Sequence, residues 1–525
     1  MVGPGRVFGW LFDSRRGPSH CFLPRWVFLR ALAGIYFSAF YSLLFQIKGL
    51  IGPRGVLPAG NYLAAVAREL GGSRYWYAPS LFWLSSDSHF LMGVMWVGLA
   101  ASIFAFLNFW PRFCFFVCLA CFLSFVAASG DFSSYQSDGM LLEAGFLALF
   151  FAPSGVLPGL AVEHPPPRAS LFLLQWEWFR IYFESGMVKL LSGDPQWRHF
   201  AAMDEYYQNS PLPTWVGWYV EHLPHGVHAF ATGGTLVMEL VVVALLFLGR
   251  RARLVCFLIV TPWEIMVILT GNYAFLNYLV LSLGFLLLDD RELWWLVRGR
   301  FRSGVVVGVG NPGKLRVPGA PGFIRVAVVA VLLTWVAYGT TAELVDMPLR
   351  TYLMPQAPIR ALEPFRIANQ YGLFAVMTRG RYEIEFQGSN DDVNWIAYPF
   401  RYKPQAIDER PGIYAPYQPR FDWNLWFASL GDWQQNQIVP LTQERLLESD
   451  ADVLGLFRGN PFAGKPPRYV RAVLWRYWFT TIEEKRRTGN WWRRELLGDY
   501  SPTLTRGADG KLGVVAWPGV LPEHD

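Results

Sequence analysis

Arg180-Ile-Tyr-Phe-Glu-Ser-Gly-Met-Val-Lys189 lies within an apolar run, residues 170–191, that is long enough to cross a lipid bilayer. Together with Glu177, the run carries four charged side chains. Each charge costs about 3 kcal/mol at the centre of a membrane even on lenient insertion scales. Such charges persist where they pair with one another, line a polar cavity or take part in chemistry. The run therefore indicates a helical membrane protein and a place to look for function.

The composition of the whole chain also indicates a polytopic membrane protein. Of its 525 residues, 53% are hydrophobic and 16% are charged, whereas about one quarter of a soluble chain is charged. The net charge of +6 comes mostly from basic residues between apolar runs, so we expect no nucleic-acid binding. Apolar runs predict about nine transmembrane helices, at 26–47, 90–110, 113–129, 135–151, 170–191, 230–249, 254–270, 273–288 and 324–341.

The distribution of basic residues predicts the orientation of these helices. With a cytoplasmic N-terminus, fifteen Lys and Arg residues of the connecting segments fall on the cytoplasmic side and five on the other side. This asymmetry satisfies the positive-inside rule. An odd number of spans then places the C-terminal part outside the cytoplasm. A segment rich in Gly, Val and Pro, 304–322, indicates a linker before the last helix.

Four regions follow from this reading of the chain. We expect a cytoplasmic segment at 1–25, a transmembrane domain at 26–345, a β-rich α+β domain at 346–500 and a C-terminal tail at 501–525. Within the β-rich domain, alternating or β-branched residues predict strands at 381–387, 395–402 and 469–479. Helical apolar spacing predicts a helix over 442–457.

The charged residues of the 170–191 run permit two interpretations. Glu177 and Glu184 lie three residues before and four residues after Arg180, so the three share one helix face and can neutralise one another. They form either a structural ion-pair network or a polar cavity that faces a substrate. Lys189 lies near the extracytoplasmic end of the run. Its ammonium group either extends to the interface or, if desolvated, acts as a general base.

Further polar residues interrupt other predicted spans or follow the charged run. Glu143, Glu239 and Glu264 lie within three of these spans, and sequence spacing does not say whether they converge. The loop that contains Asp204, Tyr206 and Tyr207 permits three interpretations. It binds a partner, it closes over a membrane cavity, or it is an ordinary well-packed extracytoplasmic loop. Three cysteines at 114, 118 and 121 share a helix face without any histidine, which favours packing over a metal site. We expect neither a metal nor another cofactor.

Residues spread over nearly the whole chain, from residue 49 onward, resemble the lipase maturation factor family. In the helical part they are 49–59, Lys189 through Tyr207 to Pro213, 238–239, 249–251, 271–272, 275–277 and 289–290. In the soluble part they are Asn369-Gln-Tyr-Gly372, Tyr417 with Arg420, 422–423, 426–428 and 460–467. The resemblance implies a multi-pass membrane protein, resident in the endoplasmic reticulum in animals, that helps lipases reach their active form.

The same resemblance implies that the C-terminal domain contacts clients. Our candidates for these contacts are Tyr206, Tyr207, Trp423, Trp426, Phe427, Asn460 and Phe462. The domain has no cysteine, and the chain ends Pro522-Glu-His-Asp525 without a retention signal. We therefore expect a bacterial-type member in the plasma membrane, whose partners are membrane lipids and a secreted or lipid-active client that need not be a lipase.

A shorter stretch supports a different function. Tyr182-Phe-Glu-Ser-Gly186 with Lys189 and Trp197 is similar to a helix of vitamin K-dependent carboxylase and its bacterial relatives, and Lys189 lies where that enzyme has its base. The first hypothesis is therefore a non-catalytic maturation factor. The second is a membrane enzyme that acts through Lys189, with Arg180, Glu184, Glu177 and Asp204 around it. The third is a lipid-handling protein or a transporter of a lipid or small molecule, which depends on Glu143, Glu239 or Glu264.

Overall fold

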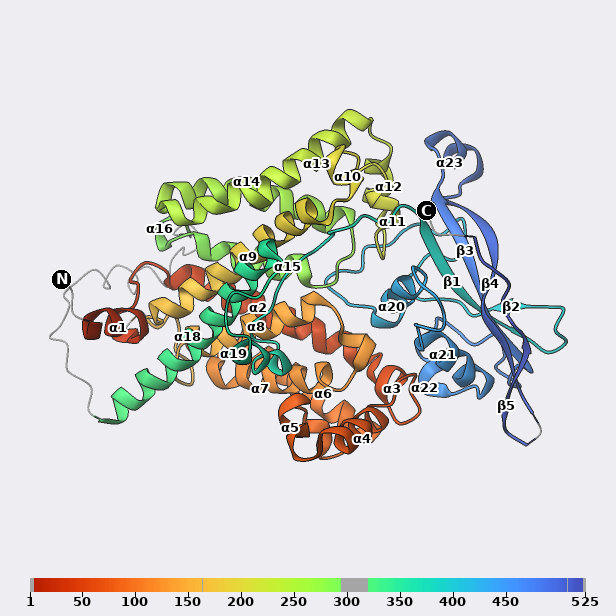
Figure 1. Ribbon diagram of the computed structural model, residues 1–525, viewed down its shortest axis with the longest axis horizontal. Helices are drawn as coiled ribbons and strands as arrows, with labels where there is room; N and C mark the ends of the chain where they lie inside the picture. Colours follow the sequence, from red (N-terminus) through yellow and green to blue (C-terminus); the bar gives the residue numbers. More distant parts are fainter. Residues whose placement is uncertain (1–3, 163, 294–319, 508, 523–525) are drawn as a thin grey trace.

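The computed structural model describes residues 4–162, 164–293, 320–507 and 509–522. A helical part and a part built on a β-sheet lie side by side along the longest axis (Figure 1). The longer helices are α2 (Phe22–Leu44), α4 (Ala59–Leu70), α6 (Ser88–Phe106), α7 (Pro111–Val126), α8 (Gln136–Phe151), α9 (Arg168–Ser192), α13 (His225–Leu240), α14 (Arg250–Thr270), α15 (Leu276–Gly284) and α18 (Ala320–Leu349). The linker expected at 304–322 lies mostly outside the described residues.

Short helices connect these elements. They are α1 (Pro4–Phe12), α3 (Ile47–Ile51), α5 (Arg74–Tyr77), α10 (Pro195–Arg198), α11 (Tyr206–Asn209), α12 (Trp215–Glu221), α16 (Asp290–Leu293), α19 (Ala357–Arg360) and the 3₁₀ helices η5 (Val242–Leu248) and η6 (Phe285–Leu287). Several of them lie at the end of the helical part that faces the sheet (Figure 1).

Each apolar run predicted to span the membrane coincides with a helix. Among the described residues, five helices are long and apolar enough to cross a membrane: 22–44, 88–106, 225–248, 250–270 and 322–349. The apolar helices 111–126 and 276–287 are shorter. α9 has 25 residues but is not among these five helices, and it carries the charged side chains at positions 177, 180, 184 and 189. The helical membrane-type region is thus confirmed, with five candidate spans.

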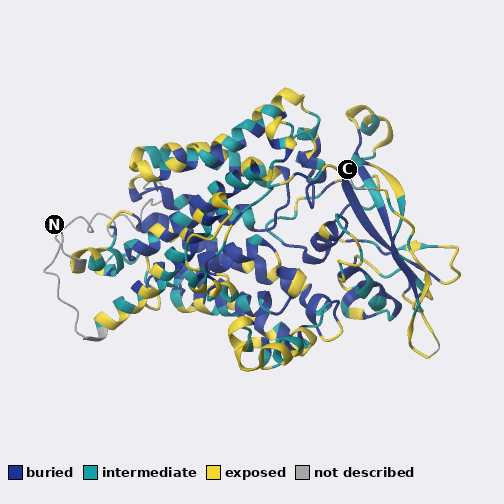
Figure 2. Cartoon of the chain, viewed as in Figure 1, coloured by how far each residue is buried: buried dark blue, intermediate teal, exposed yellow. Residues whose placement is uncertain are grey.

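The helices differ in how far they are covered by the rest of the protein. In α2, 67% of the apolar window is buried, whereas only 17% is buried in α14 and 22% in α18. The exposed residues of α14 are largely apolar, among them Leu258, Ile259 and Met266. An exposed apolar surface of this size is suited to lipid rather than water. Figure 2 shows the buried residues concentrated on the central helices.

The C-terminal part is a five-stranded antiparallel sheet in the order β2-β1-β3-β4-β5. The strands are β1 (Arg381–Ser389), β2 (Ile396–Ala397), β3 (Tyr469–Phe479), β4 (Trp492–Arg506) and β5 (Leu512–Ala516). Four helices accompany it: α20 (Arg420–Ala428), α21 (Ile438–Leu447), α22 (Ala451–Leu454) and α23 (Ile482–Thr488). α20, α21 and α22 lie between the sheet and the helical part (Figure 1).

The predicted strands at 381–387 and 469–479 are confirmed as β1 and β3. Two other predictions in this part are wrong in extent. The strand expected at 395–402 has only two residues, because Pro399 follows and offers no backbone N–H for pairing. The helix expected at 442–457 is two helices, since Ser449 adopts a left-handed φ of 49° and Asp450 caps a new helix through the backbone amides of Asp452 and Val453.

The boundary between domain and tail at residue 500 also needs correction. β4 runs through it to Arg506, and β5 pairs with β4 at 512–516. The first half of β4 is polar and carries irregular pairing, with Gly498 at a φ of 146°. These features hide the alternation from which a strand is predicted.

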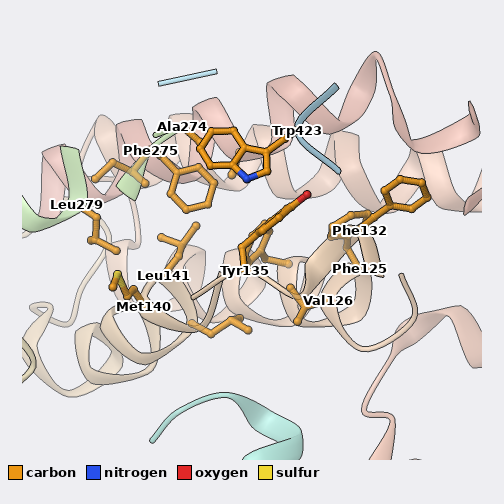
Figure 3. Close-up of a cluster of buried hydrophobic side chains, with 14 of the residues drawn as sticks. Phe125, Val126, Phe132, Tyr135, Met140, Leu141, Ala274, Phe275, Leu279 and Trp423 are labelled. Atoms are coloured by element: carbon orange, nitrogen blue, oxygen red, sulfur yellow. The ribbon is translucent and has the colours of Figure 1, made fainter. Parts of the chain in front are cut away.

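The two parts of the molecule pack closely against each other. A Cβ atom on Gly49 in α3 would lie 2.5 Å from the carbonyl oxygen of Asp452 in α22, so only glycine permits this approach. Arg54 adds an ion pair to Asp450 at 2.6 Å. Figure 3 shows Trp423 of α20 within an apolar cluster with Tyr135 and Phe275 of the helical part. The sheet-containing part is therefore attached through a packed core.

Candidate functional site

The four charged residues of α9 between Glu177 and Lys189 are all buried, but they do not meet in one place. Glu177, Arg180 and Glu184 have no exposed surface, and Lys189 retains 2%. Arg180 and Glu184 interact with a segment of the C-terminal part, whereas Lys189 pairs with a residue of α13. These intramembrane charges therefore do not converge on one site but form two separate groups.

The first group, called here the Arg180 network, joins α8 and α9 to residues 369–371. Arg180 forms a short ion pair with Glu143 and donates to the carbonyl oxygen of Asn369 at 2.6 Å. The other carboxylate oxygen of Glu143 accepts hydrogen bonds from the Tyr371 hydroxyl at 2.9 Å and from the Asn369 side-chain amide at 3.1 Å. Glu184 accepts a hydrogen bond from the backbone amide of Tyr371 at 2.6 Å.

This arrangement favours the structural interpretation of Arg180 and Glu184. Both side chains are enclosed and contact protein groups supplied by a distant segment of the same chain, whereas the two carboxylate oxygens of Glu177 have no hydrogen-bond partner among the described residues. Buried charges are tolerated when hydrogen bonds and opposite charges replace water. Glu177 lies one turn before Arg180 on α9 and is equally buried. The Arg180 network therefore holds the C-terminal part against the bundle.

A second ion pair connects the two parts at α8. Arg420, the first residue of α20, donates to both carboxylate oxygens of Asp138 at 2.7 Å. It also donates to the carbonyl oxygen of Phe132 at 2.7 Å. Its backbone amide donates to the side chain of Gln46 at 2.8 Å. Both charged side chains are fully buried, so this pair is part of the core.

The second group of α9 residues lines a cavity. Lys189 donates to both oxygens of Glu239 at 2.8 and 2.9 Å. Tyr182 donates to Glu264 at 2.6 Å. These four side chains line an otherwise largely apolar cavity of about 490 Å³, and Tyr206 lines it as well. The cavity lies between α9, α13, α14 and α15.

The residues proposed for a membrane enzyme are not assembled around Lys189. The carboxylate of Asp204 lies within hydrogen-bonding distance of the Nδ1 atoms of His225 at 3.0 Å and His228 at 3.2 Å, on the loop side of α13. Arg180 and Glu184 belong to the Arg180 network. Lys189 thus has Glu239 as its ion-pair partner at the cavity wall.

The candidate client-contact residues are mostly enclosed. Tyr206, Tyr207, Trp423, Trp426 and Phe462 are buried, Asn460 is half-buried and Phe427 is 47% exposed. Four of the seven, Tyr206, Trp423, Trp426 and Phe427, line a second cavity of about 660 Å³, called here the junction cavity. A partner reaches these four residues through that cavity or at the exposed side chain of Phe427.

Nothing in the spacing of Asn369, Tyr371 and Arg420 predicts their partners. Each lies more than two hundred residues from the acid that it contacts, 226, 228 and 282 residues respectively. The available signal is indirect: two buried acids in α8, Asp138 and Glu143, need donors from elsewhere in the chain. Only the tertiary structure supplies those donors.

Asp422 of α20, which lies outside the helical bundle, predicts that the stability of the protein depends on pH. Burial raises the pKa of Asp422 in α20 to about 6, although it accepts hydrogen bonds from the backbone amides of Tyr402 and Lys403. Because the folded-state pKa is above the unfolded value near 3.9, the fold prefers protonated Asp422. This contribution to stability is complete below about pH 4 and is lost as the pH rises through 6.

We therefore expect Asp422→Asn, which keeps the acceptor oxygen but cannot ionise, to gain stability over wild type as the pH rises. The gain is up to about 1.4 kcal/mol per pH unit between pH 4 and 6, and it levels off above pH 7. Thermal unfolding of the purified protein in detergent across this range measures it. Asp408→Asn, at an exposed position, is the control. A pH-independent difference between Asp422→Asn and wild type would contradict the prediction.

The comparisons with known proteins cover both parts of the molecule. The family model described as the lipase maturation factor transmembrane domain matches residues 23–295, and the lipase maturation factor C-terminal domain model matches residues 367–502. Lipase maturation factor 1 of Bos taurus is 33% identical over 529 residues, which covers 95% of this chain and 92% of the relative.

Other relatives agree. Lipase maturation factor 1 of Homo sapiens is 32% identical, covering 92% of this chain and 88% of the relative. Lipase maturation factor 2 of Gallus gallus is 30% identical, covering 95% of this chain and 83% of the relative. No solved structure matches this chain. With both domain models matched and the relatives aligned over most of their length, the chain belongs to the lipase maturation factor family.

Proposed function

We propose that this protein is a membrane maturation factor that helps secreted or lipid-active clients, lipases among them, to reach their active form. The observation that carries the proposal is the match of both domain models, together with relatives named lipase maturation factors that align over nearly the whole chain. The buried Arg420–Asp138 pair and the hydrogen bond from Arg180 to the carbonyl oxygen of Asn369 support it, because they join the two matched domains into one unit.

The proposed topology has nine spans and a C-terminal part outside the cytoplasm. Its support is the excess of fifteen over five basic residues on the cytoplasmic side. Secreted clients fold on the extracytoplasmic side, so the sheet-containing part is then available to them. In a bacterium the membrane is the plasma membrane, and in a eukaryote it is that of the endoplasmic reticulum.

Client contact is proposed at the rim of the junction cavity. Phe427 is the exposed aromatic residue of α20, and its ring stacks on Tyr135 with centroids 6.0 Å apart. The position at the seam between the two parts allows a client segment to contact Phe427 at the rim of the cavity. Asn460 and Phe462, on the loop before β3, form a second proposed contact.

The test is a maturation assay in cells that lack the gene, in which the activity of a secreted lipase is divided by its secreted mass. We expect wild type to restore this specific activity and Phe427→Ser to reduce it severalfold. Val393→Ser, at a loop residue that is 76% exposed, is the matched control and should restore it fully. If wild type restores neither lipase activity nor that of any other secreted client, the proposal is wrong.

Lys189→Arg separates the maturation factor from the enzyme hypothesis. Arginine keeps the charge that Glu239 requires, but it cannot serve as a neutral amine base. A maturation factor should therefore retain its activity with Lys189→Arg. Loss of client maturation with a folded and inserted Lys189→Arg protein would instead support a reactive lysine.

A further inference from the structure

The cavity beside Lys189 is open to the outer surface of membrane-spanning helices. Two of the five candidate spans, 225–248 and 250–270, contribute to its wall. Phe230 of α13 and Met266 of α14 line the cavity and are 81% and 50% exposed. Since the exposed surface of these helices is apolar, molecules that enter here come from the bilayer rather than from water.

The size and lining of this cavity suit an aliphatic chain. Its volume of about 490 Å³ lies within the range of roughly 300–1,000 Å³ that small-molecule sites occupy. Apart from a few hydroxyl and amide groups, its polar wall consists of Lys189 and Glu239, which neutralise each other, and Tyr182, which donates to Glu264. Because Lys189 is already paired with Glu239, the site offers no unpaired positive charge to an anionic headgroup.

The cavity shares a wall with the junction cavity, and hydrogen-bonding groups on that wall and beside it in the junction cavity lack partners. Tyr206, Asn277 and Phe374 line both cavities. Within the described residues, the side-chain N–H groups of Asn277, Trp423 and Trp426 have no hydrogen-bond partner. All three side chains are more than nine-tenths buried and line the junction cavity.

Three unsatisfied buried donors are costly. Each costs about 1–3 kcal/mol when it is left without an acceptor. A ligand that brings acceptor oxygens to this wall removes that cost. Ester carbonyl groups provide such acceptors without adding a charge.

We propose that the two cavities hold one acyl ester of glycerol taken from the bilayer. Its acyl chain occupies the apolar cavity between α9, α13 and α14, and its ester carbonyls accept hydrogen bonds from Asn277, Trp423 and Trp426. A client peptide fits less well, because its backbone N–H groups would enter an apolar space whose carboxylates already have partners. Binding of this lipid is a property beyond the maturation role, and it does not require a client protein.

Photocrosslinking of the purified full-length protein in phosphatidylcholine nanodiscs tests the proposal. The probe is a diacylglycerol with a diazirine in one acyl chain, and the labelled peptides are mapped by mass spectrometry. A Cβ atom on Gly234 of α13 would meet no heavy atom within 4 Å, although Gly234 lines the cavity. Gly234→Leu therefore adds a side chain to the cavity wall at a position where the new Cβ meets no neighbouring atom. Gly93→Leu in α6, where a Cβ is equally free, is the control.

We expect wild type and Gly93→Leu to be labelled on α13 or α14, and Gly234→Leu to lose about tenfold in labelling. Equal labelling of all three proteins would show only surrounding lipid and would overturn the proposal. Competition by a client peptide but not by unlabelled diacylglycerol would also overturn it.

The ester contacts are tested separately. Wild type should prefer the diester probe to its dialkyl ether analogue, which lacks carbonyl acceptors. The combined change Trp423→Phe and Trp426→Phe keeps an aromatic ring at both positions but removes two of the three donors, so this preference should fall severalfold. A free fatty acid probe that labels as strongly as the diester would overturn the assignment of an ester. These readouts do not depend on lipase maturation.

Discussion

Arg420→Ala is expected to lower the free energy of unfolding by about 3–5 kcal/mol, because it leaves Asp138 buried without its partner. Arg420 donates three side-chain hydrogen bonds, two to Asp138 and one to the carbonyl oxygen of Phe132. Water cannot replace them, since both charged side chains are fully enclosed. The loss should appear as a lower midpoint of thermal unfolding in detergent and as faster proteolysis at the junction.

The control for this change is an exposed ion pair in the same part of the molecule. Arg458 contacts Glu409 at 2.5 Å, and both side chains are substantially exposed. Pairs of this kind contribute about 0–1 kcal/mol, so Arg458→Ala should be nearly neutral. The combined change Arg420→Met and Asp138→Leu removes both charges and should recover much of the stability. If Arg420→Ala costs no more than Arg458→Ala, the junction does not depend on this pair.

Arg180→Met should be about as damaging, with an expected loss of roughly 3–5 kcal/mol. It leaves Glu143 without its ion-pair partner and removes the donor to the carbonyl oxygen of Asn369. We expect little folded protein in the membrane fraction, measured by size-exclusion chromatography after detergent extraction. Adding Glu143→Gln should restore part of the yield, because the amide carries no charge and still accepts from Tyr371.

Tyr371→Phe measures how much one hydrogen bond of the Arg180 network contributes to stability. It removes only the hydroxyl that donates to Glu143 at 2.9 Å, which should cost about 1 kcal/mol. The order of stability is therefore wild type, Tyr371→Phe, then Arg180→Met. A stable, monodisperse Arg180→Met protein would mean that the charges of α9 do not hold the two parts together.

Local pattern accounts for what sequence reasoning predicted correctly. Apolar runs long enough for a bilayer become helices wherever they occur, because the hydrogen bonds of a helix are made within the run. Alternation predicted β1, and the density of Val and aromatic residues predicted β3. β4 was missed because its first half, from Trp492 to Gly498, carries charges on exposed positions and irregular pairing. The family was also recognised from the sequence alone, because the residues that carry the resemblance are spread along nearly the whole chain.

The sequence by itself therefore determined the class of fold, the main helices, two strands and the family. Only the tertiary structure decided the partners of the buried charges. Asp138 and Arg420 are 282 residues apart, and Lys189 and Glu239 are 50 apart. The energy of such a pair depends on distance and burial in space, and neither is encoded in the spacing along the chain. For the same physical reason, the division of the α9 charges between a structural network and a cavity became visible only in the folded protein.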